Sequence, residues 1–498
     1  MAFSRVTSVQ PSFPESTLVT VEADLSRGLY SFAVVGLAGK AVEEARDRIS
    51  AAIKHSGYAS PKSHNHKLVI SLAPADLKKE GTVFDLPMAL AYLRAAEEIQ
   101  WDTDNIAFLG ELALDGTLRP VKGVLAAAVH AQRMGLTALV VPKENAAEAA
   151  LVTGIRVYGA ENLSAVVRHL SGEHRLPEAV RGSYERARPA PLVDFRDIEG
   201  QETAKRGIEI AAAGRHNVAL LGPPGTGKTM LATALQGILP RLSFEEALAI
   251  TAIHSVAGVL KDPILLDPPI RAPHHTASYP ALVGGGAVPR PGEVTLAHTG
   301  VLFLDEFPEF DRRAIEALRE PLENRSITVS RATGSVTFPA NIMLVAAMNP
   351  PDHRADPREV ARFKRSLSGA IVDRIDLWVE VPLVPHAKLA RSREGEESQA
   401  VAARVAAARE RQATRMRTLG THTTVNAELQ GKHLDARIGV LDEARDALVR
   451  AAESLRLSPR SFHRVLRIAR TIADLANAES VEVAHVLEAL HYRPKLSV

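Results

Sequence analysis

The segment GPPGTGKT, Gly222 to Thr229, constrains the fold of this 498-residue chain more than any other. A short apolar run, Val218 to Leu221, precedes it, and a helical pattern from Thr229 to Ile238 follows. A G-x-x-x-x-G-K-[ST] loop between a strand and a helix turns its backbone N–H groups toward a phosphate. The sequence therefore predicts an α/β core with a nucleotide site at this loop.

The chemistry of the loop residues predicts ATP as ligand, together with Mg²⁺. Lys228 would supply positive charge to the β- and γ-phosphates, and Thr229 would offer its hydroxyl to the metal ion. The residues that we expect to contact the nucleotide are Gly222, Pro223, Pro224, Gly225, Thr226, Gly227, Lys228 and Thr229.

Two further apolar runs end in polar residues. Val301 to Leu304 is followed by Asp305 and Glu306, which places both carboxylates at the carboxyl end of a strand, where open α/β sheets bind ligands. We expect Asp305 to hold Mg²⁺ and Glu306 to act as general base toward water. Asn349 ends a later strand and could touch the γ-phosphate, although an Asn before two prolines is also typical of a turn.

Changes in pattern along the chain predict three folded parts and a linker. Residues 1–172 mix strand and helix patterns, residues 173–192 are charged and interrupted by Pro, residues 193–385 form a doubly wound core, and residues 386–498 are helical. In the first part we expect strands over residues 18–21, 68–72, 112–118 and 138–141.

The overall composition excludes several classes of protein. Lys and Arg total 60 against 58 Asp and Glu, so net charge gives no argument for nucleic acid and any basic surface must be local. The absence of Cys excludes disulfides, thiolate zinc sites and cysteine nucleophiles. No apolar stretch approaches the ~20 residues of a membrane span. We expect a cytoplasmic protein without a membrane partner.

Long blocks of the sequence resemble the AAA+ ATPases and, within them, the magnesium-chelatase-like family in its ComM/YifB group. The resemblance covers nearly the whole chain and implies a P-loop core with a C-terminal helical lid. The blocks that carry it are RAPHHTASYPALVGGG from Arg271, SRATGSVTFPANIMLVAAMNP from Ser330, LSGAIVDRIDL from Leu367 and SPRSFHRVLRIARTIADL from Ser458.

This resemblance implies roles for three polar residues. Asn349 would be the sensor-1 residue, Arg374 an arginine finger that reaches a neighbouring subunit's nucleotide, and Arg460 the sensor-2 arginine of the lid. A structural ion pair is the alternative for Arg374, and Arg464 is a rival on the same helical face as Arg460. A finger supplied to a neighbour requires a closed ring, most simply a homohexamer.

Two histidines and one family feature bear on metal binding. Relatives commonly carry cysteines after the sensor-1 Asn-Pro, whereas here the sequence from Pro350 is PPDHR, so we do not expect zinc there. His274 and His275 are adjacent but lack a third ligand, and such pairs more often belong to a loop.

The N-terminal part also resembles the proteolytic domain of Lon proteases, over Lys78 to Leu90 and Leu114 to Asn145. That chemistry needs a serine activated by a lysine. The serine position falls on Val83 and the lysine position on Leu125. The resemblance thus implies an inactive α/β scaffold for assembly or partner binding.

Two regions are candidate DNA contacts. We expect a β-hairpin over residues 325–338, and in related AAA+ helicases such hairpins touch DNA, which makes Arg325 and Arg331 candidates; two solvated charges are the alternative. The second candidate is a set of arginines on two predicted helices, which could equally form a solvated face or a subunit interface. These are Arg404, Arg409, Arg411, Arg415, Arg417, Arg460, Arg464 and Arg467.

The function implied by the resemblance is a ring-shaped ATP-driven motor on DNA, a branch-migration helicase acting in recombination during natural transformation. One alternative is the ATPase subunit of a magnesium chelatase, against which the Lon-like part argues. The other is an ATP-dependent protease, which Val83 and Leu125 oppose.

Overall fold

The computed structural model divides the chain into two compact units. They comprise Met1–Arg186 with Phe244–Leu265, and Ala187–Ser243 with Leu266–Val498. The structure describes residues 2–63, 65–101, 105–182, 188, 190–286, 290–331, 334–351, 356–367, 369–385, 395–420, 423–429 and 438–494. The segment Phe244–Leu265 belongs to the first unit, whereas the sequence pattern placed it within the nucleotide-binding core.

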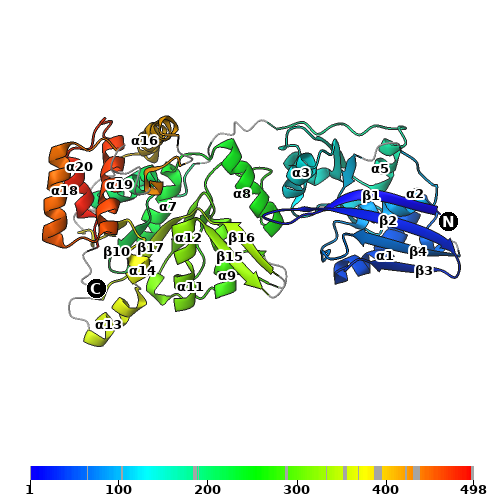
Figure 1. Ribbon diagram of the computed structural model, residues 1–498, viewed down its shortest axis with the longest axis horizontal. Helices are drawn as coiled ribbons and strands as arrows, with labels where there is room; N and C mark the ends of the chain where they lie inside the picture. Colours follow the sequence, from blue (N-terminus) through cyan, green and yellow to red (C-terminus); the bar gives the residue numbers. More distant parts are fainter. Residues whose placement is uncertain are drawn as a thin grey trace. The chain divides into compact units, whose positions relative to one another are not determined.

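The first unit is built on a seven-stranded mixed sheet in the order β3-β4-β2-β1-β5-β8-β9 (Figure 1). Side chains alternate between buried and more exposed along β2, as its period of two requires. The strands are β1 Ala2–Gln10, β2 Thr17–Arg27, β3 Ser31–Val35, β4 His66–Ala73, β5 Ile106–Phe108, β8 Ala138–Pro142 and β9 Arg156–Ala160. The helices are α1 Lys40–His55, α2 Asp85–Ala95, α3 Val124–Arg133, α4 Lys143–Ala149 and α5 Leu163–Leu170.

The expected strand over residues 112–118 is wrong. Two short strands stand in its place, β6 Glu111–Leu112 and β7 Leu118–Arg119, and they pair antiparallel. Gly116, with φ of 86°, turns the chain between them, because a left-handed backbone suits glycine.

Helix α8, Phe244–Ala257, completes the first unit although it follows the nucleotide-loop helix in sequence. Its Ala252 packs in one apolar cluster with Leu125 and Leu151. Its Ser255 hydroxyl donates a hydrogen bond to the buried carboxylate of Glu148, which also accepts from the backbone N–H of Leu125. Burial of Glu148 raises the pKa of its carboxyl group.

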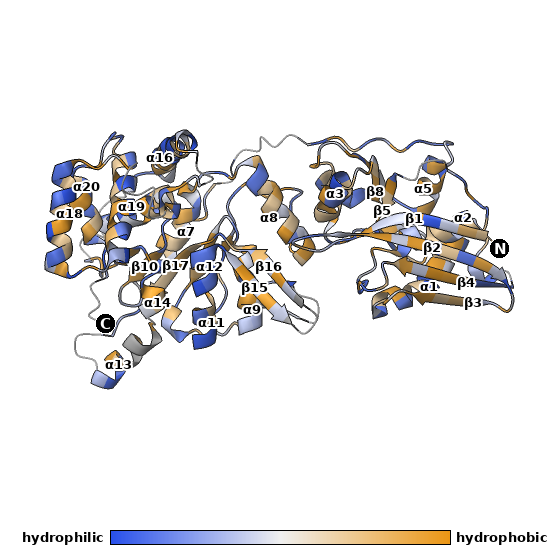
Figure 2. Ribbon diagram, in the orientation of Figure 1, coloured by the Kyte–Doolittle hydropathy of each residue, from blue (hydrophilic) through white to orange (hydrophobic). Residues whose placement is uncertain are grey.

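The second unit contains a five-stranded parallel sheet in the order β11-β14-β17-β10-β18. Strands β14 and β17 are buried along their whole length and apolar throughout, as expected of a parallel sheet covered on both faces. Figure 2 shows β17 in the hydrophobic colour. The strands are β10 Val218–Leu221, β11 Ile270–Arg271, β14 Val301–Leu304, β17 Met343–Met348 and β18 Leu377–Glu380. Helices α6 Glu202–Gly214 and α7 Lys228–Ile238 flank β10 in the chain.

The predicted hairpin after the core strand β14 is confirmed: β15 Ser326–Arg331 pairs antiparallel with β16 Gly334–Pro339. A smaller pair joins β12 Gly284–Gly285 to β13 Arg290–Pro291. The short helices of this region are α9 Tyr279–Val283, α10 Glu293–Leu296, α11 Arg312–Ala317, α12 Arg319–Asn324, α13 Pro357–Ser366 and α14 Gly369–Val372.

The C-terminal part of the second unit is helical, as predicted, and is drawn in orange and red in Figure 1. Its helices are α16 Ser398–Thr418, α18 Asp442–Leu455, α19 Pro459–Leu475 and α20 Val483–His491. Arg470 of α19 is buried and forms an ion pair of 2.9 Å with Asp474, and it also donates to the carbonyl oxygens of Ile438, Ala478 and Glu479. Buried charges with this many partners hold a helical layer in one register.

The arginines of α16 are not a free basic face. Arg404 pairs with Glu209 at 2.7 Å and also with Glu396, and Arg409 donates to the carbonyl oxygen of Ala212. The other partners are the Asp474 carbonyl for Arg411, the Asp474 carboxylate for Arg415 and Glu410 for Arg417. The suggested phosphate-binding role of this helix is therefore not supported, because its guanidinium groups mostly fasten it to α6 and α19.

We expect Arg470→Ala to destabilise the second unit by about 3 kcal/mol or more, because it leaves a buried carboxylate short of a partner. Arg417→Ala is the matched control: its exposed ion pair should contribute no more than about 1 kcal/mol. Urea unfolding followed by circular dichroism measures both, and equal midpoints for the two variants would contradict the structural role of Arg470.

Candidate nucleotide-binding site

Three neighbouring parallel strands bring the predicted site residues to one edge of the sheet. Strand β17 lies between β14 and β10, and the register pairs Leu304 with Ala346 and Leu221 with Met348. Asp305, Asn349 and Gly222 each follow directly after one of these strands. The Gly222 N–H donates to the Met348 carbonyl oxygen at 3.2 Å, which fixes the start of the loop beside Asn349.

The loop after β10 depends on its glycines. A Cβ atom on Gly222 would lie 2.1 Å from the carbonyl oxygen of Val381, so only glycine fits against that strand end. Gly225 and Gly227 have φ of 78° and 89°, in the left-handed region. The Thr226 hydroxyl donates to the Pro223 carbonyl oxygen at 3.0 Å and closes the turn. The residues present fit a phosphate cradle.

Lys228 folds back over this loop. Its Nζ donates to the carbonyl oxygens of Gly222 and Pro223 at 2.8 and 2.7 Å. Burial lowers the pKa of Lys228, and the charge of Asp305 opposes that shift. An ammonium group that donates to carbonyl oxygens can exchange them for the stronger, charged oxygens of a phosphate.

Thr229 and Asp305 form the pair expected at a magnesium site. The Thr229 hydroxyl, in the first turn of α7, donates to the Asp305 carboxylate at 3.0 Å, and the other Asp305 oxygen accepts from the Glu306 N–H at 2.9 Å. Hydroxyl and carboxylate oxygens are the ligands that Mg²⁺ prefers beside substrate phosphates. Both side chains can therefore hold that ion without rearrangement of the strands.

Glu306 has a partner that the sequence did not indicate. It has a left-handed backbone, with φ of 51°, and its Oε2 lies 2.9 Å from Nδ1 of His275. The ring of His275 stacks on that of His274 with centroids 4.2 Å apart. Because β11 pairs in parallel with β14, the residues that follow these strands lie close together. A two-residue strand gives too short a pattern to be recognised from sequence.

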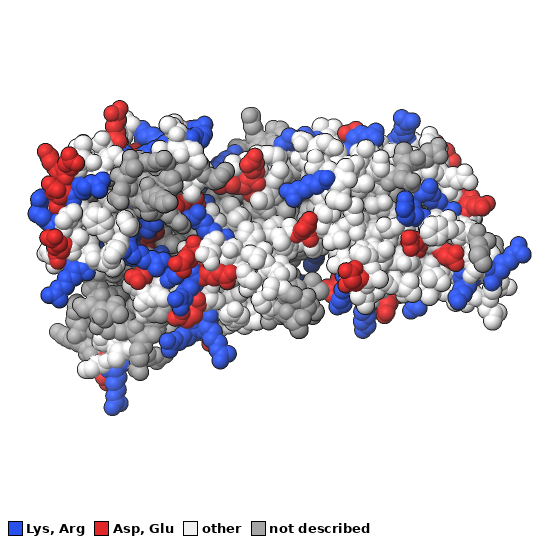
Figure 3. All heavy atoms as spheres, viewed as in Figure 1, with Lys and Arg blue, Asp and Glu red and all other residues white. Residues whose placement is uncertain are grey.

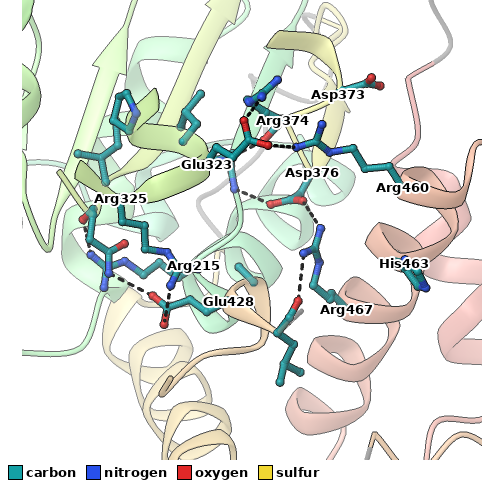
Figure 4. Close-up of a pocket in the computed structure, with 17 residues that line it drawn as sticks. Arg215, Glu323, Arg325, Asp373, Arg374, Asp376, Glu428, Arg460, His463 and Arg467 are labelled. Carbon is teal, nitrogen blue, oxygen red and sulfur yellow. Dashed lines mark hydrogen bonds and ion pairs between the residues drawn. The ribbon is translucent and has the colours of Figure 1, made fainter. Parts of the chain in front are cut away.

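Arg374 and Arg460 meet at a different place in the second unit (Figure 4). Both bind the carboxylate of Glu323, Arg460 at 3.4 Å. With Glu323 they line a cavity of about 370 Å³, whose lining includes none of the loop residues 222–229 and neither Asp305, Glu306 nor Asn349. The structure thus brings together the loop and the strand-end residues, and separately the two arginines.

Other arginines around this cavity have structural partners. Arg464, the rival of Arg460, is buried and donates to the Asp373 carbonyl oxygen at 2.8 Å. Arg325 pairs with Glu428 at 3.3 Å at the base of the hairpin, so the expectation that it reaches a polymer is not supported. The side chain of Arg331, the second hairpin candidate, lies outside the described part of the structure.

Within the described ranges, no group of three or more His, Cys, Asp or Glu residues could hold a metal ion. Asp352 to Arg354, in the segment for which the sequence predicts no zinc, are outside those ranges. The described helices also include none long and apolar enough to cross a membrane.

Comparison with known families gives three matches along the chain. Residues 194–389 match "Magnesium chelatase, subunit ChlI", residues 21–145 match "Subunit ChlI of Mg-chelatase", and residues 395–493 match "Magnesium chelatase, subunit ChlI C-terminal". The first match contains the nucleotide loop, Asp305, Glu306, Asn349 and Arg374, and the third contains Arg460.

Individual relatives are similar over nearly their full length. Competence protein ComM of Haemophilus influenzae is 42% identical over 493 residues, 96% of this chain and 95% of that protein. YifB of Escherichia coli K12 is 44% identical over 494 residues, 95% of this chain and 94% of that protein. A more distant match is DNA replication licensing factor mcm7 of Xenopus tropicalis, 27% identical over 183 residues, 36% of this chain and 22% of that protein.

We expect Gly222→Ala to displace the loop from β18, because its new methyl group would meet the Val381 carbonyl oxygen. A displacement of about 1 Å at such a site lowers turnover on the order of 10²-fold. Gly420→Ala, after α16 and outside the loop, is the control, since open space surrounds that position and only its left-handed backbone costs about 1 kcal/mol. Phosphate release at saturating ATP should separate the two variants, and equal turnover would contradict the close approach.

Proposed function

This chain belongs to the magnesium chelatase subunit ChlI family, in its ComM/YifB group, and from that membership we propose that it hydrolyses ATP to act on DNA. The observation that supports ATP hydrolysis most directly is that hydrogen bonds hold four residues at the glycine loop. These are Lys228, Thr229, Asp305 and Glu306. Family membership and site geometry agree on this chemistry.

We assign the chemical roles as follows. Backbone N–H groups of the loop and the Lys228 ammonium bind the phosphates, and Thr229 with Asp305 would hold Mg²⁺, which supplies charge neutralisation when bound. Glu306 accepts the proton of the attacking water, which requires its carboxylate to turn from His275 toward the γ-phosphate. Asn349, at the end of the adjacent β17, orients that water.

The position of Arg374 and Arg460 supports a shared site between subunits. They line a cavity that excludes their own chain's loop, so we propose that they serve the nucleotide of a neighbouring copy. A guanidinium group supplied in this way stabilises the charge on the γ-phosphate in the transition state, worth about 10³–10⁵ in rate in related enzymes. Head-to-tail contacts of this kind close into a ring, for which we propose six copies.

DNA as the substrate is supported by the names of relatives and by the fold. One full-length relative is a competence protein, and a distant one is a DNA replication licensing factor. On the face seen in Figure 3, basic and acidic side chains alternate over the C-terminal helices, so DNA contact there would need local elements. We propose the β15–β16 hairpin as that element, without Arg325, which pairs with Glu428. As the activity we propose branch migration of recombination intermediates during natural transformation.

The first unit carries a proposed scaffold role. Val83 and Leu125, at the positions of the Lon serine and lysine, are both buried apolar residues, so they offer neither nucleophile nor base. We propose that this Lon-like part assists assembly. The chelatase motor remains the second candidate, because the family descriptions name it; chain-dependent insertion of magnesium into a porphyrin would favour it.

We expect Lys228→Ala to weaken ATP binding about tenfold or more, because no other described side chain supplies a cation inside the loop. Glu306→Gln should bind ATP normally but lower turnover about 10²–10⁴-fold, since the amide cannot accept a proton. Glu309→Gln, three residues on, is the control. Binding and phosphate release are measured separately, and unchanged turnover in Glu306→Gln would remove the assigned base.

We expect a four-way DNA junction to stimulate ATP turnover and to be migrated in an ATP-dependent way. Glu306→Gln should bind the junction without moving it. Failure of any DNA form to stimulate the wild-type chain would count against a DNA motor while leaving the ATPase assignment intact.

A further inference from the structure

We propose that Glu323 positions Arg374 and Arg460 as a pair in the free chain and yields both to the γ-phosphate of a neighbouring copy's ATP. Glu323 thus restrains the shared site: while it pairs with the two arginines, it opposes their binding to a neighbouring copy's nucleotide. This inference rests on the proposed function, in which the two arginines act on a neighbour. Glu323 belongs to neither the nucleotide loop nor the strand ends that carry the other residues of the proposed site.

The geometry makes one carboxylate the shared partner of two cations. Glu323 lies in α12, Arg374 follows α14, and Arg460 begins α19 of the helical part. Each Glu323 oxygen accepts from one guanidinium group, Oε2 from Arg374 and Oε1 from Arg460 (Figure 4). The side chain of Arg374 is 7% exposed, whereas those of Glu323 and Arg460 are 51% and 47% exposed.

The charges at this site favour replacement of the Glu323 carboxylate by a phosphate as the partner of the two arginines. Hydrogen bonding to Arg374, and then the charges of both arginines, lower the pKa of Glu323, so it is ionised at neutral pH. Two guanidinium groups facing one carboxylate leave an excess positive charge. A terminal phosphate has more negative charge and more acceptor oxygens than a carboxylate, and arginine binds both groups with the same paired geometry.

Arg374 also has unused bonding capacity. Its Nε is buried and has no hydrogen-bond partner among the described residues, while its Nη1 donates to the Ala370 carbonyl oxygen at 2.6 Å. A buried donor without an acceptor is costly, so an additional oxygen at the cavity would be stabilising.

The surroundings hold the backbone at Arg374 in place while leaving the Glu323 side chain able to move. Asn217 donates to the Arg374 carbonyl oxygen at 2.9 Å, and Arg464 donates to the carbonyl oxygen of Asp373. Glu323 by contrast is half-exposed, and its 3.4 Å contact with Arg460 is of the weak surface kind. The carboxylate is therefore the partner that leaves when a stronger anion arrives.

Glu323 therefore opposes the ATP-dependent association of copies of this chain. In a solitary chain Glu323 neutralises part of the charge that should act on a neighbour's nucleotide, and binding that nucleotide requires both contacts to break. Removal of the carboxylate charge should lower the ATP concentration at which copies associate. It should not lower the rate of the chemical step, because Glu323 does not touch the phosphate.

The test compares full-length Glu323→Gln with Glu320→Gln, the matched control on the same helix. Glu320 accepts from the Thr328 N–H instead, and glutamine can still accept that bond. In the Glu306→Gln background, which should prevent ATP consumption, light scattering against ATP concentration gives the assembly midpoint. We expect Glu323→Gln to lower the midpoint about threefold to tenfold and Glu320→Gln to leave it unchanged.

ATP turnover of the single variants, with Glu306 intact, shows whether Glu323 opposes assembly or takes part in catalysis. Glu323→Gln at saturating ATP should keep its kcat within about twofold of wild type. An unchanged assembly midpoint, or a tenfold loss of kcat, would overturn the proposal. Glu323→Asp keeps the charge on a shorter side chain that cannot reach both arginines. We expect its assembly midpoint to lie between those of wild type and Glu323→Gln. A midpoint above that of wild type would also contradict the proposed role of Glu323.

Arg374→Ala distinguishes failure of this inference from failure of the proposed function. If Arg374→Ala turns over ATP at the wild-type rate, the shared site itself is wrong. If Arg374→Ala is impaired while Glu323→Gln matches wild type in both assembly and turnover, only the restraint fails. The double variant Glu323→Gln with Arg374→Ala should be as inactive as Arg374→Ala alone.

Discussion

The parallel pairing of β14, β17 and β10 is the constraint on which the rest of the site depends. In parallel strands the carboxyl ends lie at one edge, so the residues after Leu304, Met348 and Leu221 are neighbours although they are far apart in sequence. The loop then sits against the end of β18, because Gly222 has no side chain to separate it from Val381. A bulkier residue there would disturb phosphate cradle and sheet together.

Features encoded locally could be predicted from the sequence, and features made by distant partners could not. The buried strands and the loop follow from short patterns, and so does the helical character of the C-terminal part. Arg404 of α16 meets Glu209, which is 195 residues away, so a cluster of arginines could not be distinguished from a free basic face. Helix α8 buries consecutive residues from Ile250 to Ser255, a pattern that shows a core helix without showing which core it joins.

The placement of α8 also bears on the proposal that the first unit has no protease chemistry. Leu125, at the position of the Lon lysine, packs in the same apolar cluster as Ala252 of α8. A lysine there would bring an ammonium group into a buried apolar cluster, at a cost of several kcal/mol unless paired. Residue 125 can therefore either pack against α8 as an apolar side chain or serve as a catalytic lysine, but not both. In this chain it is a leucine that packs against α8.

In the proposed shared site, the separation of the nucleotide loop from Arg374 and Arg460 would link ATP binding to association of subunits. If a neighbour's nucleotide replaces Glu323 as the partner of both arginines, ATP strengthens the interface and the interface strengthens ATP binding by the same factor. Hydrolysis removes the γ-phosphate, and with it the anion that competes with Glu323. The carboxylate then regains the arginines, so the same half-exposed side chain that opposes assembly also favours release of the interface after turnover. Loss of the γ-phosphate weakens the proposed interface with or without Glu323, so removal of the carboxylate charge shifts the balance between associated and separate copies without stopping turnover.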